Sequence, residues 1–358
     1  MDIRELFTPA AIAAVWNDNV SNRVPYLGAG LFPAKKKAGL DLKWIKGSKG
    51  LPVSLMPTAF DAQATFRDRP GLEITETEMP FFREGFKIKE KDRQELLRIQ
   101  ENNDPYLQEI MVRLFDDANE LIEGAEVVAE RERMQLLFPA DGNVGITIKA
   151  NGVDYTYDFD AAVNGTRKWK STNYFALTGT ALWTAPATAD PFKDIRTAKK
   201  AVIANTGSTP AHAIMNSYTF DLLTQIDAVK NRFLTVSGLS FGYLTDDQVT
   251  DVFSNTTGLN IVVYDKQYKD ESGTVHGFVP DGYVAIIPDG GLGSTYYGTT
   301  PEEIDGRAAN MDVSIVNTGV AISQIVEPHP VNINTLASEI VLPSYERMDE
   351  VALLKVIA

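Results

Sequence analysis

Hydrophobic and polar positions follow two different periods along the chain, and each change of period marks a predicted element. From 105 to 138 apolar residues recur at three- and four-residue steps, with no proline after Pro105. From 146 to 159 apolar and polar residues alternate around Asn151-Gly152, a dipeptide typical of a two-residue hairpin turn. These segments predict a helix of roughly 50 Å, at 1.5 Å per residue, followed by a β-hairpin.

The same reading predicts the other elements. Residues 22–37 contain two prolines and two glycines and predict an extended arm rather than a packed element. The β-branched run at 259–264 predicts a buried strand. Further helices are predicted at 9–18, 91–99, 191–204, 219–232 and 245–253, and strands at 40–44, 53–56, 73–89, 211–216, 274–279, 283–287, 313–326, 331–342 and 351–357. The mixture predicts an α+β fold.

Composition indicates a folded protein and excludes several classes of function. The chain has 358 residues, enough for two or three domains, and is 44% hydrophobic. It has no cysteine, which excludes disulfides, thiolate metal sites and cysteine nucleophiles. A net charge of -14 argues against attraction to nucleic acid as the main activity. The sequence has no apolar run long enough to span a membrane, and residues 1–20 do not resemble a signal peptide. We therefore expect a cytoplasmic protein, or a particle that is assembled in the cytoplasm.

Charge is distributed unevenly. Residues 35–49 carry a net charge of +5, whereas the predicted helix at 105–138 carries -5. The residues from 35 to 56 predict a long hairpin with few core partners, either a solvated surface hairpin or an arm that lies on another molecule. The opposite signs make the helix a candidate surface for that arm. The candidate interface residues are Lys35, Lys36, Lys37, Lys43, Trp44, Lys46, Lys49, Asp116, Asp117, Glu120 and Glu123.

A search for catalytic and ligand-binding patterns yields little. The three histidines lack metal-ligand spacing, and the glycine-rich stretch at 289–294 lacks the lysine of a phosphate loop and predicts a turn. Adjacent acids at predicted helix starts are explained by the helix dipole. An isopeptide bond between a lysine of 35–49 and an asparagine is a further possibility, but no pair is marked. We therefore predict no catalytic, metal or cofactor site and no enzyme. The residues considered are His212, His276, His329, Asp246, Asp247, Glu302, Glu303, Asn317, Asn332 and Asn334.

The order of arm, basic hairpin, long acidic helix, β-hairpin, α/β block and closing strands resembles a known family. It is similar to the major capsid proteins of tailed bacteriophages, of the phage lambda type (the capsid protein E family), with the Hong Kong 97-type fold. The resemblance rests on Glu130–Leu137, on Trp169–Ile195 with its DPFKDI, on Ile214-Met215-Asn216, and above all on Leu259–Ile287. These are packing patterns, so their order carries the resemblance.

The resemblance implies a domain organisation. Residues 1–34 would form an N-terminal arm and 35–80 an extended loop that reaches over a neighbouring subunit. A peripheral domain would span 81–189, with the spine helix at 105–138 and the β-hairpin at 146–159. Residues 190–312 would form an axial domain, and 313–358 would supply closing strands, mainly to the peripheral domain.

The implied function is that of a major capsid protein, which self-assembles into the icosahedral shell around the double-stranded DNA genome of a tailed phage. Implied partners are further copies in hexamers and pentamers, a separate scaffolding protein, a portal protein and a decoration protein. DNA would be enclosed without sequence-specific binding, and no cofactor is expected. The protein would belong to the virion shell, assembled in the host cytoplasm.

Three alternatives remain from the sequence. One is the shell protein of an encapsulin-type nanocompartment, which would have the same fold but enclose enzymes. Another is a cytosolic hydrolase that uses buried carboxylates. The third is a generic binding module, which would leave the arm unexplained.

Overall fold

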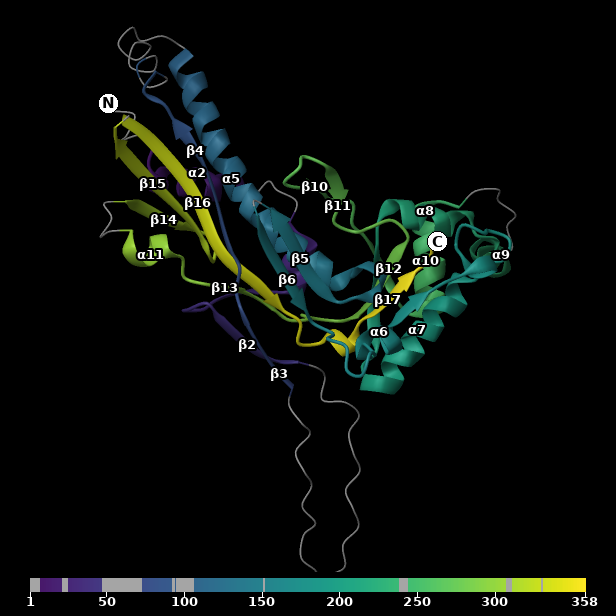
Figure 1. The fold of residues 1–358 in the computed structure, drawn as a ribbon. Coiled ribbons are helices and arrows are strands. Elements are labelled where there is room, and N and C mark those ends of the chain that lie inside the picture. The colour runs from purple at the N-terminus through teal and green to yellow at the C-terminus, as the bar shows by residue number, and fades with distance from the viewer. Residues whose placement is uncertain are drawn as a thin grey trace, which may run out of the picture. The chain divides into compact units, whose positions relative to one another are not determined.

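The computed structural model describes residues 7–20, 25–46, 73–91, 94, 106–150, 152–237, 244–306, 311–329 and 331–358. Its mixture of helices and strands confirms the predicted α+β class (Figure 1). The chain divides into two compact units. The first unit comprises 1–43, 76–132 and 294–344, and the second comprises 44–75, 133–293 and 345–358.

The first unit is built on one long sheet. Its strands are β1 (Ala34–Lys36), β4 (Phe81–Ile88), β13 (Ser294–Tyr297), β14 (Asp312–Val316), β15 (Val320–Pro328) and β16 (Val331–Ser344). The 14-residue β16 is central, because it pairs with β15, β4 and β13 along different parts of its length. The order β1-β13-β16-β15-β14 leaves β1 and β14 at the two edges.

Helices cover this sheet and supply half of its core. They are α2 (Pro9–Val20), α3 (Leu27–Leu31), α5 (Tyr106–Leu137) and α11 (Pro301–Asp305), the last five residues of α5 belonging to the second unit. Ile12 and Trp16 of α2 and Ile122 of α5 are fully buried in one hydrophobic cluster with residues of β14, β15 and β16. Helix α5 therefore confirms the long predicted helix, with an apolar face turned toward the sheet (Figure 1).

The prediction of an extended, unpacked segment at 22–37 is wrong for the described residues. Helix α3 forms there, Phe32 is fully buried, and its carbonyl oxygen accepts a 2.9 Å hydrogen bond from the Thr295 hydroxyl. Strand β1 then pairs with β13 in parallel. Both glycines lie within α3 and the two prolines lie on either side of it, and the burial of Phe32 stabilises this packed segment.

Two predicted long strands are each divided in two. The strand at 313–326 becomes β14 and β15, since Asn317 adopts a φ of 51° and the chain reverses there. The strand at 73–89 becomes β3 (Glu73–Glu78) and β4, with Pro80 between them, because proline has no N–H for a ladder.

Strand β2 (Asp41–Lys46) pairs with β3 (Figure 1). The predicted partner strand at 53–56 and the turn at 47–50 lie outside the described residues, as does most of the predicted helix at 91–99. The structure therefore does not test the predicted hairpin, and the described partner of β2 comes more than 25 residues later in the chain. Next to the pair, the amide of Met79 donates to the carbonyl oxygen of Leu40 at 2.9 Å.

The second unit contains a five-stranded sheet in the order β7-β17-β12-β8-β9, together with two hairpins. Its strands are β5 (Gly145–Ala150), β6 (Val153–Asp158), β7 (Tyr174–Ala176), β8 (Pro210–Met215), β9 (Asn260–Val263), β10 (Gln267–Lys269), β11 (Val275–Gly277), β12 (Tyr283–Pro288) and β17 (Ala352–Lys355). Strand β12 is buried along its whole length at the centre. The predicted hairpin at 146–159 is confirmed as β5 and β6, and Gly152 in its turn has a φ of 79°.

Helices pack against this sheet and enclose the larger hydrophobic core. They are α6 (Lys168–Asn173), α7 (Pro191–Thr206), α8 (Ser217–Gln225), α9 (Asp227–Ser237) and α10 (Asp246–Thr257), with short 3-10 turns at Ala140–Gly142, Gly179–Ala181 and Met348–Glu350. The helices predicted at 191–204 and 245–253 are confirmed as α7 and α10. At their starts the Asp190 side chain accepts from the Lys193 amide, and Thr245 forms a capping box with Gln248.

Two predictions in the second unit are wrong. The single helix at 219–232 is two helices, because Ile226 adopts an extended ψ of 129° and is fully buried, while the Asp227 amide donates to the Pro186 carbonyl oxygen at 3.0 Å. The strand at 259–264 is not buried throughout, since β9 is an edge strand with Asn260 and Val263 exposed. Edge position is a property of the sheet order, which the local sequence does not encode.

Candidate subunit interface

The middle of α5 presents an acidic face to solvent. Asp116, Asp117, Glu120 and Glu123 are exposed, whereas Ala118 and Ile122 on the opposite side are buried. At 100° per residue the four acids lie within an arc of about 120°. We call these four residues the acidic face. In the described part of the chain, Asp116, Asp117 and Glu120 form no ion pair. The helix therefore buries one side in its own unit and leaves four candidate carboxylates on the other.

The charged residues at the C-terminal end of α5 are not all exposed to solvent. Glu130 and Glu132 are fully buried and Arg133 is 4% exposed. One Glu130 carboxylate oxygen accepts the backbone N–H of Gly28 at 2.9 Å, so this acid holds the start of α3 within the first unit. The net charge of -5 predicted for one surface is thus divided between surface and interior. The helical period does not separate Glu130 from the acidic face, because Glu130 follows Glu123 by seven residues, about two turns of the helix.

The candidate lysines lie on two strands. Lys35 and Lys36 are exposed on β1, and Lys43 is exposed on β2. Lys36 forms a 2.6 Å ion pair with Glu303, and the Lys35 ammonium lies 5.7 Å from the centre of the Tyr296 ring. The half-buried Lys37 donates to the carbonyl oxygen of Asp41 at 2.5 Å. Trp44 and Lys46 belong to β2, but their side chains lie outside the description, and Lys49 lies outside the described residues altogether.

An ion pair between an exposed arginine and a buried glutamate, which the sequence reasoning missed, lies at the start of α11. Glu302 is 5% exposed in the first turn of α11, pairs with Arg83 of β4, and accepts a 2.9 Å hydrogen bond from the Ser338 hydroxyl of β16. With the pair between Lys36 and Glu303, this cluster ties α11 to three strands of the first unit. The adjacent acids at this helix start were expected only to favour the helix dipole. Their partners come from strands far away in the sequence, so no local signal could identify them.

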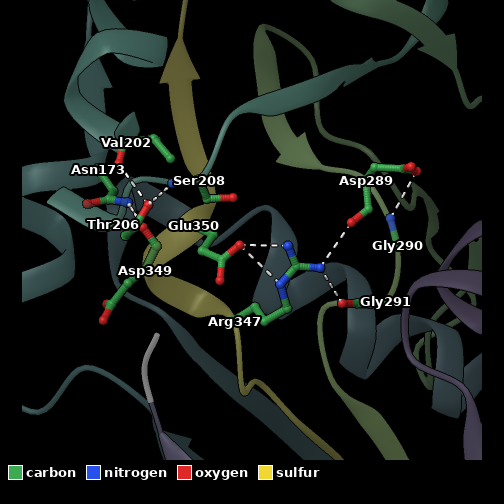
Figure 2. A network of polar contacts seen from close by, with 10 residues as sticks. All are labelled: Asn173, Val202, Thr206, Ser208, Asp289, Gly290, Gly291, Arg347, Asp349 and Glu350. Atoms are coloured by element: carbon green, nitrogen blue, oxygen red, sulfur yellow. Dashed lines mark hydrogen bonds and ion pairs between the residues drawn. The ribbon is translucent and has the colours of Figure 1, made fainter. Parts of the chain in front are cut away.

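The glycine-rich stretch at 289–294 is a turn, as predicted, and Arg347 holds it (Figure 2). The Arg347 guanidinium donates to the carbonyl oxygens of Asp289 and Gly291 at 3.0 and 2.9 Å, and to Glu350 at 3.1 and 2.6 Å. Gly290 supplies the φ of 85° that this turn requires. Because carbonyl oxygens face the cation, the loop does not offer the row of amides that binds phosphate. Burial raises the pKa of Glu350, but the hydrogen bonds from Arg347 and Ser208, together with the positive charge of Arg347, outweigh it and bring the pKa below its ordinary value.

The candidate histidines and acids do not gather into a metal site. His276 lies 2.9 Å from Asp270 at a hairpin turn, and His212 lies 3.6 Å from Asp289. Over the described ranges, no group of three or more histidine, aspartate or glutamate side chains is placed to hold a metal ion.

The three candidate amides for an isopeptide bond are all engaged by glutamates. Asn317 donates to Glu126 at 2.8 Å, while Asn332 and Asn334 donate to Glu327 at 3.2 and 2.8 Å. The lysine beside this group is not one of 35–49 but Lys87, which lies across the sheet from Asn334 and pairs with Glu327 at 2.9 Å. Hydrogen bonds from Lys87, Asn334 and Asn332 lower the pKa of Glu327 to about 2. An ionised, solvent-exposed carboxylate fits a structural ion pair and not the dry site that amide condensation needs.

Glu327 makes the stability of the first unit depend on pH. Its pKa is about 2 in the folded chain against 4.5 ordinarily, so its contribution to stability is fully present above pH 4.5 and disappears as pH falls toward 2. At pH 6 we expect the unaltered protein to have a larger free energy of unfolding, measured by urea titration, than the Glu327→Gln variant. The difference should shrink steadily below pH 4.5. Asp221→Asn, which alters an exposed carboxylate of the second unit, serves as control. A difference that stays constant with pH would contradict the assignment.

Comparison with known proteins agrees with the geometry. The family model described as phage major capsid protein E matches residues 8–356. No curated protein matches the chain. Among solved structures, a putative capsid protein of a prophage of E. coli CFT073 has a TM-score of 0.60 at 13% identity, covering 98% of this chain and 99% of that one. A phage-related protein from Bordetella bronchiseptica RB50 has a TM-score of 0.55 at 14% identity, covering 96% of both chains.

A third solved structure, the capsid asymmetric unit of cyanophage A-1(L), has a TM-score of 0.50 at 12% identity and covers 93% of this chain and 92% of that one. At these identities the structures establish a shared fold, the Hong Kong 97-type capsid fold. The described helices include none with the length and apolar character that spanning a bilayer requires. The matching family is one of structural shell proteins, which decides against the carboxylate-dependent hydrolase. The chain belongs to the phage major capsid protein E family and is a structural protein of the virion shell of a bacteriophage.

Proposed function

We propose that copies of this chain close the icosahedral shell of a tailed phage through hexamers and pentamers, with the basic segment at 35–49 of one copy lying on the acidic face of its neighbour. One observation carries this proposal. Asp116, Asp117 and Glu120 are exposed and form no ion pair in the described part of the chain, although the helix that bears them is anchored in its own core. Such a rigid row of like charges is suited to a partner of opposite sign.

The candidate lysines carry the opposite, positive charge, and those described lie on or next to strands β1 and β2. Lys35 and Lys43 are exposed, and Lys36 forms an ion pair with Glu303 of its own chain. A single exposed ion pair contributes little, about 0.2–1 kcal/mol. Several pairs in each contact, repeated over every copy of a shell, sum to a selective and stabilising interaction.

In this proposal the two compact units have different places. The first unit, with the spine helix α5 and the long sheet, corresponds to the peripheral domain, and residues 35–80 correspond to the extended loop. The helices α7 to α10 and the sheet around β12 correspond to the axial domain, where copies meet around the ring axes. A separate scaffolding protein, a portal protein and a decoration protein would act as further partners. The net charge of -14 suits a container that repels the DNA it encloses.

Electron microscopy of the purified protein tests the proposal directly. We expect closed shells, or five- and six-membered rings, which contain only copies of this chain. Light scattering should give a mass far above the 39.4 kDa of the single chain. A particle that stays monomeric at high concentration, and also when co-expressed with the neighbouring phage structural proteins, would contradict it. Extraction and sequencing of the contents separates a DNA-filled shell from a compartment that encloses protein.

A further inference from the structure

A basic groove lies on the helical side of the second unit. It has a volume of about 410 Å³ and runs between α7, α9 and the end of α10. Its lining residues are Asp190, Phe192, Lys193, Arg196, Thr197, Lys200, Arg232 and Thr256. Lys193, Arg196 and Lys200 recur at three- and four-residue steps along α7 and are all exposed. Four cations and a single carboxylate therefore meet in one groove of a chain with a net charge of -14.

Part of this positive charge already serves the fold. Arg196 donates to the carbonyl oxygen of Thr256 at 3.4 Å, and the neighbouring Lys199 donates to that of Thr257 at 2.9 Å. These contacts satisfy carbonyls at the C-terminal, negative end of α10. Lys193, Lys200 and Arg232 make no such contact, and within the described residues none of them forms an ion pair. The fold therefore does not account for three of the four cations.

The opposite end of α10 carries the complementary charge. Asp246, Asp247 and Asp251 are exposed there, and the helix contains no lysine or arginine. Thr256, at the groove, lies ten residues from Asp246, which places the two ends about 15 Å apart along the helix axis. Asp246 and Asp247 are therefore too far to reach the groove of their own copy, and Asp251, about 7.5 Å from Thr256 along the axis, does not line that groove. A surface that bears complementary patches at separate places favours head-to-tail association, which closes into rings.

We infer that the groove receives the acidic end of α10 from the next copy, head to tail around each ring. This inference rests on the proposed function and assigns residues to the ring contact. Lys193 and Lys200 face Asp247 and Asp251 of the neighbour, and Arg232 closes the side of the groove. The phosphate backbone of enclosed DNA is the other chemistry that four cations could bind. The matching acidic end within the same unit and the acidic character of the whole chain favour a second copy.

Two charge-reversed chains test the inference. The groove variant is Lys193→Glu with Lys200→Glu, and the end variant is Asp247→Lys with Asp251→Lys. Arg196, Lys199 and Thr245 stay unchanged, so the contacts that hold α10 remain. Lys168→Glu with Lys269→Glu alters two exposed lysines of the same unit and is the matched control. Circular dichroism melting of each variant confirms that the subunit is folded.

We expect the groove variant and the end variant each to need a subunit concentration at least about tenfold higher to form rings, while the control assembles normally. The fourfold variant, with both reversals in one chain, should assemble as the unaltered protein does. An equal mixture of the groove and end variants should restore six-membered rings, because alternating copies put opposite charges together at every contact. Five-membered rings should stay absent, since an odd ring cannot alternate.

Normal rings from both reversed variants would overturn the inference, as would failure of the fourfold variant to assemble or an equal loss in the control. Normal shells from the groove variant with less retained DNA would overturn it in favour of a phosphate-binding groove. If the unaltered protein forms neither rings nor shells, the proposed function fails and this inference fails with it. If shells form but the charge swap has no effect, the inference is refuted and the proposed function is not.

Discussion

Replacing Lys43, Lys46 and Lys49 by glutamate is expected to abolish shell assembly and leave the subunit folded. The substitutions turn a segment of net charge +5 into one of -1, so that it would repel the acidic face of a neighbouring α5 instead of attracting it. Lys43 is exposed, so its replacement removes no core packing. We expect the subunit concentration required for shells to rise more than about tenfold. Sedimentation and electron microscopy measure the loss, and circular dichroism measures the fold.

A second variant reverses the charges on the other side of the proposed contact, the acidic face of α5. Asp116→Lys, Asp117→Lys and Glu120→Lys should block assembly alone and restore it when combined with the three glutamates. Lys91→Glu, Lys168→Glu and Lys269→Glu change the same charge at three other exposed positions and should assemble normally. Raising the salt concentration should weaken assembly of the unaltered protein, because exposed charges are screened. Shells of normal yield from the triple lysine variant would refute the electrostatic contact.

The second large effect is on stability and tests whether helix α2 packs in the core of its own chain. Trp16→Ala is expected to lower the free energy of unfolding by about 3–5 kcal/mol, because it removes a fully buried indole from a packed core. Trp16 lies in one cluster with Ile12, Ile122 and Ile322, which brings together α2, α5 and β15 of the first unit. Urea unfolding of the unassembled subunit, followed by fluorescence and circular dichroism, measures the change.

Ile315→Ala is the control for this experiment, since Ile315 of β14 is 50% exposed and should cost less than about 1 kcal/mol. A small effect of Trp16→Ala in the unassembled subunit would mean that α2 is not held in its own unit before assembly. In that case α2 would act as an arm for another copy, as the resemblance alone implies for residues 1–34. The structure places it in the core of its own chain.

Local sequence signals predicted the elements that short-range physics controls. The period of α5, the Asn151-Gly152 turn and the caps at Asp190 and Thr245 all depend on residues within a few positions of one another, and all four are confirmed for the described residues. The predictions that failed required knowledge of distant partners. The packing of Phe32, the break at Ile226 and the edge position of β9 depend on contacts with parts of the chain far away in sequence.

The mixed fold, the lack of cysteine chemistry, the uneven charge and the ordered features of the capsid family can all be inferred from the amino-acid sequence. Which charges are available to a neighbour depends on how the chain folds. The fold turned Glu130 and Glu132 of α5 inward and left Asp116, Asp117 and Glu120 outside, and it gathered Lys193, Lys200 and Arg232 from two helices into one groove. The reason is physical: the sequence fixes the number and sign of charges, but solvent exposure and proximity are set by how the elements pack.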